Sequence, residues 1–190
     1  TRIGADGSIV AFDTGPGNAL IDDLVRERTG ASMDVDGALS ASGTVQLQSL
    51  AELMDDPWFS LPPPKSLDRD AFSRAPVARL STADACATLA AFTAESIARA
   101  VALAGGAGEI IVCGGGAHNP AILRQLAEAS GAKVMTADSL GWSGDFMEAQ
   151  AFAYLAARSV AGLPLSLPET TGVPHPMPGG VLAEPGAVAP

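Results

Sequence analysis

The chain has 190 residues, of which 47% are hydrophobic and 17% charged, and its formal net charge at pH 7 is -10. This length accommodates one domain with a full hydrophobic core, and the composition is ordinary for a globular protein. Because an acidic chain without a Lys/Arg cluster cannot neutralise nucleic-acid phosphates, the charge excludes a nucleic-acid partner.

The first predicted elements surround a turn rich in glycine and proline. Residues 9–12 are predicted to form a strand, residues 13–18 (DTGPGN) a turn, and residues 19–28 an amphipathic helix. Two shorter helical segments are predicted within residues 33–56, the second of them at 45–54.

A proline-rich loop follows at residues 56–66 and reads DPWFSLPPPKS. Its prolines disfavour the interiors of both helices and sheets. A stiff loop with one lysine, Lys65, can present that ammonium to an anion. A solvated lysine beside a surface proline run fits the composition as well, so both interpretations stay open at this point.

The second half of the chain alternates helices and strands. Helices are predicted at residues 81–104 and 120–130, strands at 109–112 and 133–136, and a last long helix at 145–160. The order implies crossover connections, and therefore an α/β fold with a largely parallel sheet at this end.

Local features refine these assignments. The apolar helix at 81–104 carries interior polar residues, which predicts a buried helix and no membrane span. Asp145 is predicted to cap the last helix, with Glu148 completing a capping box. Cys86 and Cys113 form no disulfide framework, so both are predicted to be reduced, buried thiols of a cytoplasmic protein.

The sequence EIIVCGGGAHNP, at residues 109–120, predicts a strand, a glycine turn and a helix. Asn119 is a good N-cap and Pro120 suits the first helical position. The triplet Gly114 to Gly116 leaves bare backbone beside a helix N-terminus, an arrangement that favours an anion such as a phosphorylated ligand. The glycines also suit a tight turn with no ligand. The turn alone does not decide between an anion-binding role and a purely structural one.

The glycine turn can also be aligned with the dinucleotide fingerprint G-x-G-x-x-G, with Asp138 near the position of a ribose-binding acid. Asn119 stands where the third glycine belongs, and the motif lies late in the chain behind a long helix. An NAD-binding domain is therefore the less favoured alternative.

Several motifs occur in an order that resembles the carboxyl-terminal half of the anhydro-N-acetylmuramic acid kinases, a branch of the sugar kinase, Hsp70 and actin superfamily. The motifs are FDTGPGN (12–18), PPPKS (62–66), VCGGGAHNP (112–120), TADSLG (136–141), GD with MEAQAFAYLA (144–156), and GLP with LP and TG (162–172). The combination of FDTGPGN with PPPKS is the most specific. The sequence departs from the family pattern at 67–70, where it has LDRD and the family has Thr-Gly-Arg-Glu, and at Ser166, where the family has Asn.

The resemblance implies a ribonuclease H-like (actin-like ATPase) lobe, with a mainly parallel-sheet end flanked by helices. This would be the second lobe of a two-lobed kinase, spanning residues 1–161 with a helical insertion near 31–75. Residues 162–190, rich in proline, are expected to form a non-regular tail that is packed on the surface or partly disordered. The first-lobe phosphate loop has no counterpart, so the chain is expected to be inactive without that lobe.

The resemblance also implies the reaction: ATP- and Mg²⁺-dependent hydrolysis of 1,6-anhydro-N-acetylmuramic acid with phosphorylation of O6, in cell-wall recycling. Asp13 matches the general base, although its spacing alone also suits an Asx-turn residue. Glu148 matches a sugar contact, and Asn18 and Lys65 are further substrate-binding candidates.

On the nucleotide side, the resemblance points to Gly114, Gly115, Gly116 and Asn119, with Gly15 and Gly17 as further candidates, and to no protein metal ligand. His118 is expected to shape the turn. A homodimer is the expected assembly, and a non-catalytic nucleotide-binding module of the same superfamily is the remaining interpretation.

Overall fold

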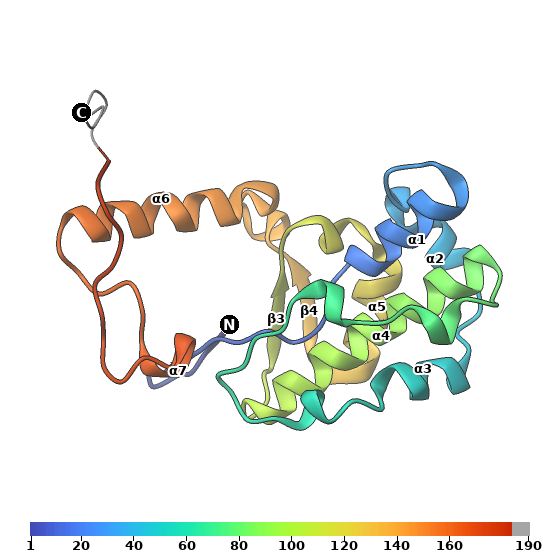
Figure 1. The fold of residues 1–190 in the computed structure, drawn as a ribbon, viewed down its shortest axis with the longest axis horizontal. Coiled ribbons are helices and arrows are strands. Elements are labelled where there is room, and N and C mark those ends of the chain that lie inside the picture. The colour runs from blue at the N-terminus through green and yellow to red at the C-terminus, as the bar shows by residue number, and fades with distance from the viewer. Residues whose placement is uncertain (184–190) are drawn as a thin grey trace, which may run out of the picture.

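A computed structural model describes residues 1–183 as a mixed α/β fold (Figure 1). Short 3-10 turns separate several of its elements. In chain order, these elements are β1 (Arg2–Ile3), β2 (Ile9–Val10), α1 (Ala19–Thr29), α2 (Ala38–Ser42), α3 (Leu47–Met54), α4 (Thr82–Leu103), β3 (Glu109–Val112), α5 (Pro120–Ser130), β4 (Lys133–Thr136), α6 (Met147–Val160) and α7 (Pro168–Thr171).

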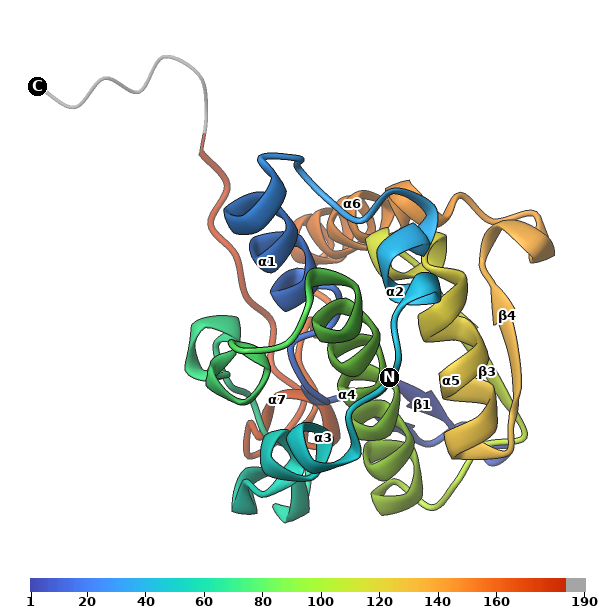
Figure 2. The ribbon, with the colours of Figure 1, turned by 90° about the vertical axis from the view of Figure 1, so that its right-hand side faces the viewer.

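Helix α4 is the centre of the fold, with α1, α2, α3 and α5 around it (Figure 2). It begins at the N-cap Ser81, whose hydroxyl accepts a hydrogen bond from the Asp84 N–H. By length and composition α4 could cross a membrane, but 61% of its most apolar stretch is buried in this fold, which confirms the predicted buried helix. The core around it comprises Leu20, Ile21, Leu24, Val25, Leu53, Trp58, Phe59, Val77, Ala85, Cys86, Leu89, Ala90, Phe92, Ala121 and Ile122.

The predicted parallel sheet is present as one pair of strands. β3 pairs with β4 in parallel, with Glu109 opposite Lys133, and α5 forms the crossover between them. Within residues 1–183, the other sheet is the antiparallel hairpin β1–β2. β2 is shorter than predicted because the chain leaves the ladder after Val10, and the Asp13 N–H donates to Lys65 O.

The helices predicted in the first half of the chain are confirmed. α1 ends at Gly30, which caps it in a left-handed conformation (φ 78°) that favours glycine. The proline-rich loop is less extended than predicted, because a 3-10 turn forms at Pro57–Ser60. Asp56 caps this turn by accepting from the Trp58 N–H at 2.8 Å. The turn buries Trp58 and Phe59 against the core.

The predicted capping box at residues 145–148 is wrong. A 3-10 turn occupies Gly144–Phe146, α6 begins at Met147, and no side chain caps it. The Asp145 carboxylate instead lies 2.9 Å from His118 Nε2. Glu148 is left in the first turn of α6 without a capping role.

Cys113 is exposed, so its predicted burial is wrong, whereas Cys86 is buried as predicted. Side chains alternate along β3, and Cys113 continues the exposed face that also carries Glu109 and Ile111. No other element covers that face among the described residues.

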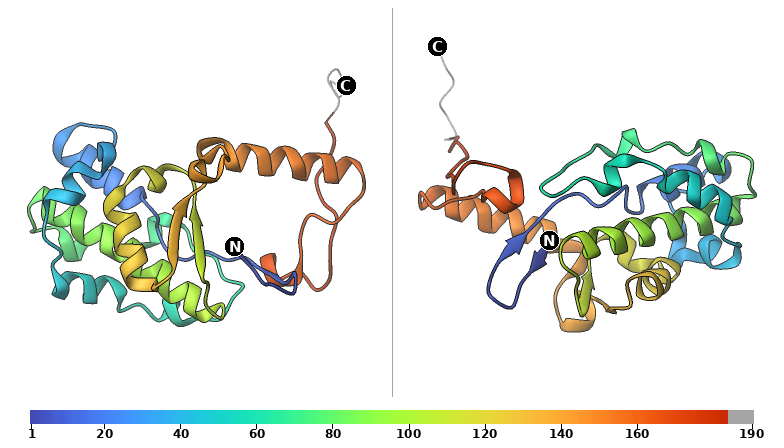
Figure 3. Two further views of the ribbon diagram at one scale, coloured as in Figure 1. Left: turned by 180° about the vertical axis from the view of Figure 1, so that it is seen from behind. Right: turned by 90° about the horizontal axis from the view of Figure 1, so that it is seen from below.

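The tail is more regular than predicted up to residue 183. It contains α7, and the Ala11 N–H of the amino-terminal segment donates to Glu169 O at 3.2 Å. A bridge between Ser166 and Met177 folds the segment back on itself. Figure 3 shows α7 beside the hairpin β1–β2. The prediction for residues 184–190 lies outside the described residues.

Candidate functional site

Asp13 joins the two most specific motifs of the sequence. Its N–H donates to Lys65 O at 3.0 Å, and its Oδ2 accepts from the Leu67 N–H at 3.1 Å. The FDTGPGN turn and the PPPKS loop are therefore in direct contact although Asp13 and Leu67 are 54 residues apart in the chain. The Asp13 side chain is exposed, and no hydrogen bond to its Oδ1 is found within residues 1–183. A fixed carboxylate with one free oxygen can accept a proton from a bound water.

Two polar residues of α4 hold this turn in place. The Thr93 hydroxyl donates to Gly17 O at 2.7 Å. A Cβ added to Gly15 would lie 2.5 Å from Ser96 Oγ, so only glycine allows this close approach. Gly17 has φ +61°, which also favours glycine. Both glycines thus have a packing reason to be present, whether or not they contact a ligand.

The Asn18 side chain forms a hydrogen bond with α1. Its Nδ2 donates to Asp22 Oδ1 at 2.9 Å, while its Oδ1 is buried without a hydrogen-bond partner among the described residues. Asn18 occupies the N-cap position of α1 but makes no capping bond. Burial raises the pKa of the Asp22 carboxyl, and the hydrogen bond from Asn18 partly offsets this effect.

Lys65 does not extend into solvent. Its Nζ donates to Trp58 O at 2.8 Å and lies 4.2 Å from the centroid of the Trp58 ring. Burial lowers the pKa of Lys65, and the nearby Arg99 charge adds to the effect. The ammonium therefore anchors the proline-rich loop to the aromatic residues beneath it.

The glycine turn presents bare backbone. Gly114 has φ +73°, and the residues after it form a 3-10 turn at Gly115–His118. A Cβ placed on Gly115 or Gly116 would meet no atom within 4 Å, so the space above both residues is open. A flat ligand can therefore lie directly against this backbone, which is the arrangement expected for a nucleotide.

Two contacts tie the glycine turn to the start of α6. The Gly114 N–H donates to Gly144 O at 3.3 Å, and His118 Nε2 lies 2.9 Å from Asp145 Oδ1. The hydrogen bond and the charge of Asp145 raise the pKa of the His118 imidazole. His118 therefore contacts the segment before α6 from the end of the glycine turn.

Asn119 is buried and supports the turn from below. Its Oδ1 accepts from the Ala121 N–H at 3.0 Å and the Ile122 N–H at 3.3 Å, which confirms the predicted N-cap. Its Nδ2 donates to Ser40 Oγ at 3.3 Å, and Ser40 Oγ donates to Asp34 Oδ2 at 2.7 Å. Because this buried side chain already bonds through both Oδ1 and Nδ2, its direct effect is on the shape of the turn.

The Asp34–Ser40–Asn119 chain of hydrogen bonds was not predicted from the sequence. All three side chains are buried, yet Asp34 and Ser40 lie in a polar stretch that resembles an ordinary surface connection. The interior polar residues of α4 predicted a buried helix, but not the contacts that Thr93 and Ser96 make with the Asp13 turn. The one sequence signal for those contacts was that Thr93 and Ser96 are polar residues within a long apolar segment.

Glu148 is exposed on α6. In the described part of the chain, no hydrogen bond or ion pair joins it to Asp13 or to the glycine turn. The structure therefore brings Asp13 and the Lys65 loop together. Glu148 lies in the first turn of α6, just after the segment that contacts the glycine turn, but its own side chain is bonded to neither group among the described residues.

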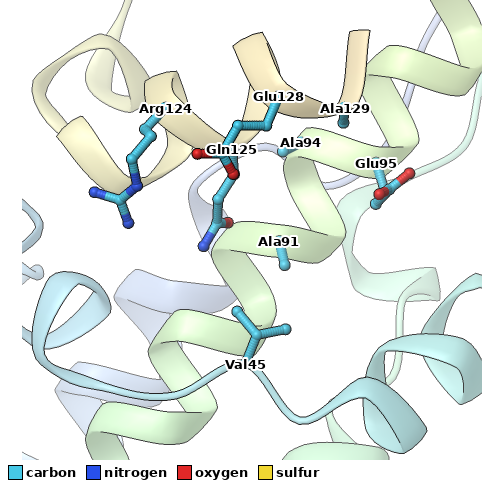
Figure 4. A pocket seen from close by; sticks show the side chains of 8 residues that line it. All are labelled: Val45, Ala91, Ala94, Glu95, Arg124, Gln125, Glu128 and Ala129. Carbon is cyan, nitrogen blue, oxygen red and sulfur yellow. The ribbon is translucent and has the colours of Figure 1, made fainter.

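A cavity of about 360 Å³ lies elsewhere, between α4 and α5 (Figure 4). None of the predicted site residues lines it. We assign the candidate site to the Asp13 turn and the glycine turn instead, because these carry the two most specific motifs and the open glycine backbone. The cavity is lined by Val45, Ala91, Ala94, Glu95, Arg124, Gln125, Glu128 and Ala129.

Residues 1–183 contain no group of three or more His, Cys, Asp or Glu side chains that could hold a metal ion. Mg²⁺ commonly uses one or two carboxylates together with substrate phosphates and water. With the Asp13 Oδ1 reserved for proton transfer, a Mg²⁺ here would be held chiefly by the phosphates of the nucleotide.

Comparison with known proteins identifies the family. The family model for anhydro-N-acetylmuramic acid kinase matches residues 1–184. A protein of that name from Caulobacter vibrioides is 54% identical over 181 residues, covering 95% of this chain and 49% of the relative. Those from Acidiphilium cryptum and Rhodospirillum rubrum are 51% and 53% identical, covering 53% and 46% of their own lengths. The chain thus spans about half the length of the curated relatives it matches, and it belongs to the anhydro-N-acetylmuramic acid kinase family.

Proposed function

We propose that this chain is the second lobe of a kinase that converts 1,6-anhydro-N-acetylmuramic acid, ATP and water to N-acetylmuramic acid 6-phosphate and ADP. The observation that carries the proposal is the contact between the FDTGPGN turn and the PPPKS loop at Asp13. The names of the relatives support the sugar and the reaction class.

In this mechanism Asp13 is the general base. A water molecule attacks the anomeric carbon, the bond between that carbon and O6 breaks, and O6 forms a bond to the γ-phosphorus of ATP as ADP leaves. Asp13 accepts the proton of the attacking water. Its Oδ2 is held by the Leu67 N–H, so its position is fixed while Oδ1 remains free. Because O6 forms its new bond to phosphorus as its bond to the anomeric carbon breaks, no second carboxylic acid is needed to protonate it.

ATP would lie with its adenosine against the open backbone of Gly114 to Gly116. Asn119 donates its N–H to Gly116 O at 3.2 Å, and its buried side chain is fixed by α5 and Ser40, so it would hold the end of that turn in place. Gly15 and Gly17 would shape the turn nearer the phosphates. Mg²⁺ would be held by the phosphates and water, and would neutralise charge on the triphosphate.

Substrate selection would involve three further residues. Glu148 would accept hydrogen bonds from sugar hydroxyls once α6 is closed onto the substrate. Lys65 would act by fixing its loop against Trp58, because its Nζ is already bonded there. Asn18 would position the base by fixing the end of the turn at the start of α1.

The larger organisation is part of the same proposal. Residues 1–161 would form a ribonuclease H-like lobe with a helical insertion near 31–75, followed by the tail from residue 162. The protein would act in the cytoplasm, in cell-wall recycling, as a homodimer. The chain would be inactive without a first lobe that supplies the remaining phosphate contacts.

The test joins this chain to the half of the Caulobacter vibrioides relative that lies outside its match. The chimera is incubated with ATP, Mg²⁺ and the anhydro sugar, and the products are identified by mass spectrometry. We expect a sugar phosphate only when both substrates are present, and none from residues 1–190 alone. A folded chimera that binds ADP without phosphorylating the sugar would show a nucleotide-binding module instead.

A further inference from the structure

Helix α6 carries an apolar stripe that no part of the described chain covers. Ala149, Phe152, Ala153, Ala156 and Val160 recur at the three- and four-residue spacing that places side chains on one helix face. All five are exposed, Phe152 to 64% and Val160 to 75%. A stripe of this kind on a globular protein is normally packed against another element.

The helix also lacks support from the rest of the fold. None of its residues is buried, and Figures 1 and 3 show it standing apart from the helices that surround α4. Its side-chain hydrogen bonds to other segments lead to the tail, from Arg158 Nε to Pro164 O and from the Ser159 hydroxyl to Gly179 O. Because isolated helices of this length are marginal in water, α6 requires packing that these contacts do not provide.

The hairpin and β3 add exposed apolar residues on the side toward which α6 extends. Ile3 of β1 is 74% exposed and Ile111 of β3 is 42% exposed. In both Figure 1 and Figure 3, β3 faces this side and β4 the opposite one. Within residues 1–183 the outer edge of β3 has no partner strand. Such an edge accepts a further strand.

We propose that the apolar stripe of α6 is the docking surface for the half of the family's fold that the relatives carry outside their match to this chain. The family match runs over α6, so the helix belongs to the shared fold, and the relatives are about twice as long as the matched part. One additional lobe of that size can cover α6, Ile3 and the free edge of β3 together.

This inference rests on the proposed two-lobed organisation but not on the proposed chemistry. It predicts that the first lobe makes its contacts through α6, and that docking sets the position of Glu148 in the first turn of that helix. The small side chains Ala149, Ala153 and Ala156 allow a partner helix to approach closely, while Phe152 provides the largest apolar contact.

Amide hydrogen exchange tests the proposal without depending on turnover. In residues 1–190 alone, we expect the α6 amides to exchange within about tenfold of the unstructured rate, while the α4 amides are strongly protected. In the chimera with the other half of the Caulobacter relative, the α6 amides should slow by roughly 100-fold or more. If the chimera does not fold, the intact relative is measured over its segment aligned with α6.

A charged variant identifies the surface. Phe152→Asp should leave the thermal midpoint of residues 1–190 unchanged but remove the protection of α6 in the chimera. Leu47→Asp is the matched control, because Leu47 is 76% exposed on α3, far from α6 in Figure 1, and it should leave that protection intact.

Two results would overturn the proposal. One is an α6 that stays unprotected in a folded chimera or in the intact relative. The other is self-association of residues 1–190 in sedimentation, abolished by Phe152→Asp, with α6 already protected in the absence of the other half. That result would assign the stripe to a second copy of this chain. A chimera with protected α6 but no kinase activity would refute only the proposed function.

Discussion

The substitution Asn119→Ala tests the hydrogen-bond network beneath the glycine turn. It removes the Oδ1 that caps the Ala121 and Ile122 N–H groups and the Nδ2 that donates to Ser40 Oγ. Loss of an N-cap costs about 0.5–2 kcal/mol. Asn119 is only 2% exposed, so solvent cannot readily replace the lost partners, and leaving a buried polar group unpaired costs about 1–3 kcal/mol. Because the two terms overlap, we expect a loss of about 2–3 kcal/mol in the free energy of unfolding.

The assay is urea unfolding of residues 1–190, monitored by circular dichroism. With an m value of about 2 kcal/mol/M, the midpoint should fall by about 1–1.5 M. Asn18→Ala is the matched control, because Asn18 occupies the N-cap position of α1 but makes no capping bond. Its removal should cost about 1 kcal/mol or less. Equal losses for the two variants, or a loss below about 0.5 kcal/mol for Asn119→Ala, would refute the assigned network.

Three further predictions concern single residues. Gly15→Ala places a Cβ 2.5 Å from Ser96 Oγ and should destabilise the chain by about 1–3 kcal/mol in thermal unfolding. Gly115→Ala enters open space, and an equal loss there would contradict the packing argument. The pKa of His118 is raised by Asp145, so the stability this pair contributes is present below the unfolded pKa of His and is lost as pH rises through the folded pKa. Asp145→Asn should lower the His118 pKa in an NMR titration, and an unchanged value would exclude the contact in solution. Burial raises the pKa of the Cys86 thiol to about 11, so a thiol reagent should modify only exposed Cys113 in the native chain, and rapid labelling of both would contradict the fold.

Periodicity and caps predicted the helices and the β3–β4 pair well, because those signals are local. The boundaries of α5 follow from Asn119, Pro120 and the residue after the helix, Gly131, each of which acts within one turn. Local signals also explain the failure at α6: Asp145 and Glu148 have the spacing of a capping box, but the contact between Asp145 and His118 competes for the same carboxylate.

The candidate site was predicted only in part, because its geometry depends on contacts between distant segments. The resemblance to the kinase family pointed to Asp13, but nothing in the sequence showed that the Leu67 N–H would hold its carboxylate. Likewise, a lysine in a proline run does not reveal a Trp58 carbonyl within reach of its ammonium. The helix at 145–160 was predicted, but the exposure of its apolar side chains is a property of the fold.

Turnover of the Asp13→Asn variant tests the central claim most directly. In the chimera with the other half of the Caulobacter relative, this substitution should lower kcat by at least roughly 100-fold and leave the ADP affinity in calorimetry within about threefold. Asp70→Asn, which changes a nearby carboxylate that is 88% exposed, should retain nearly full activity. An Asp13→Asn chimera with substantial turnover would contradict the assignment of Asp13 as the base.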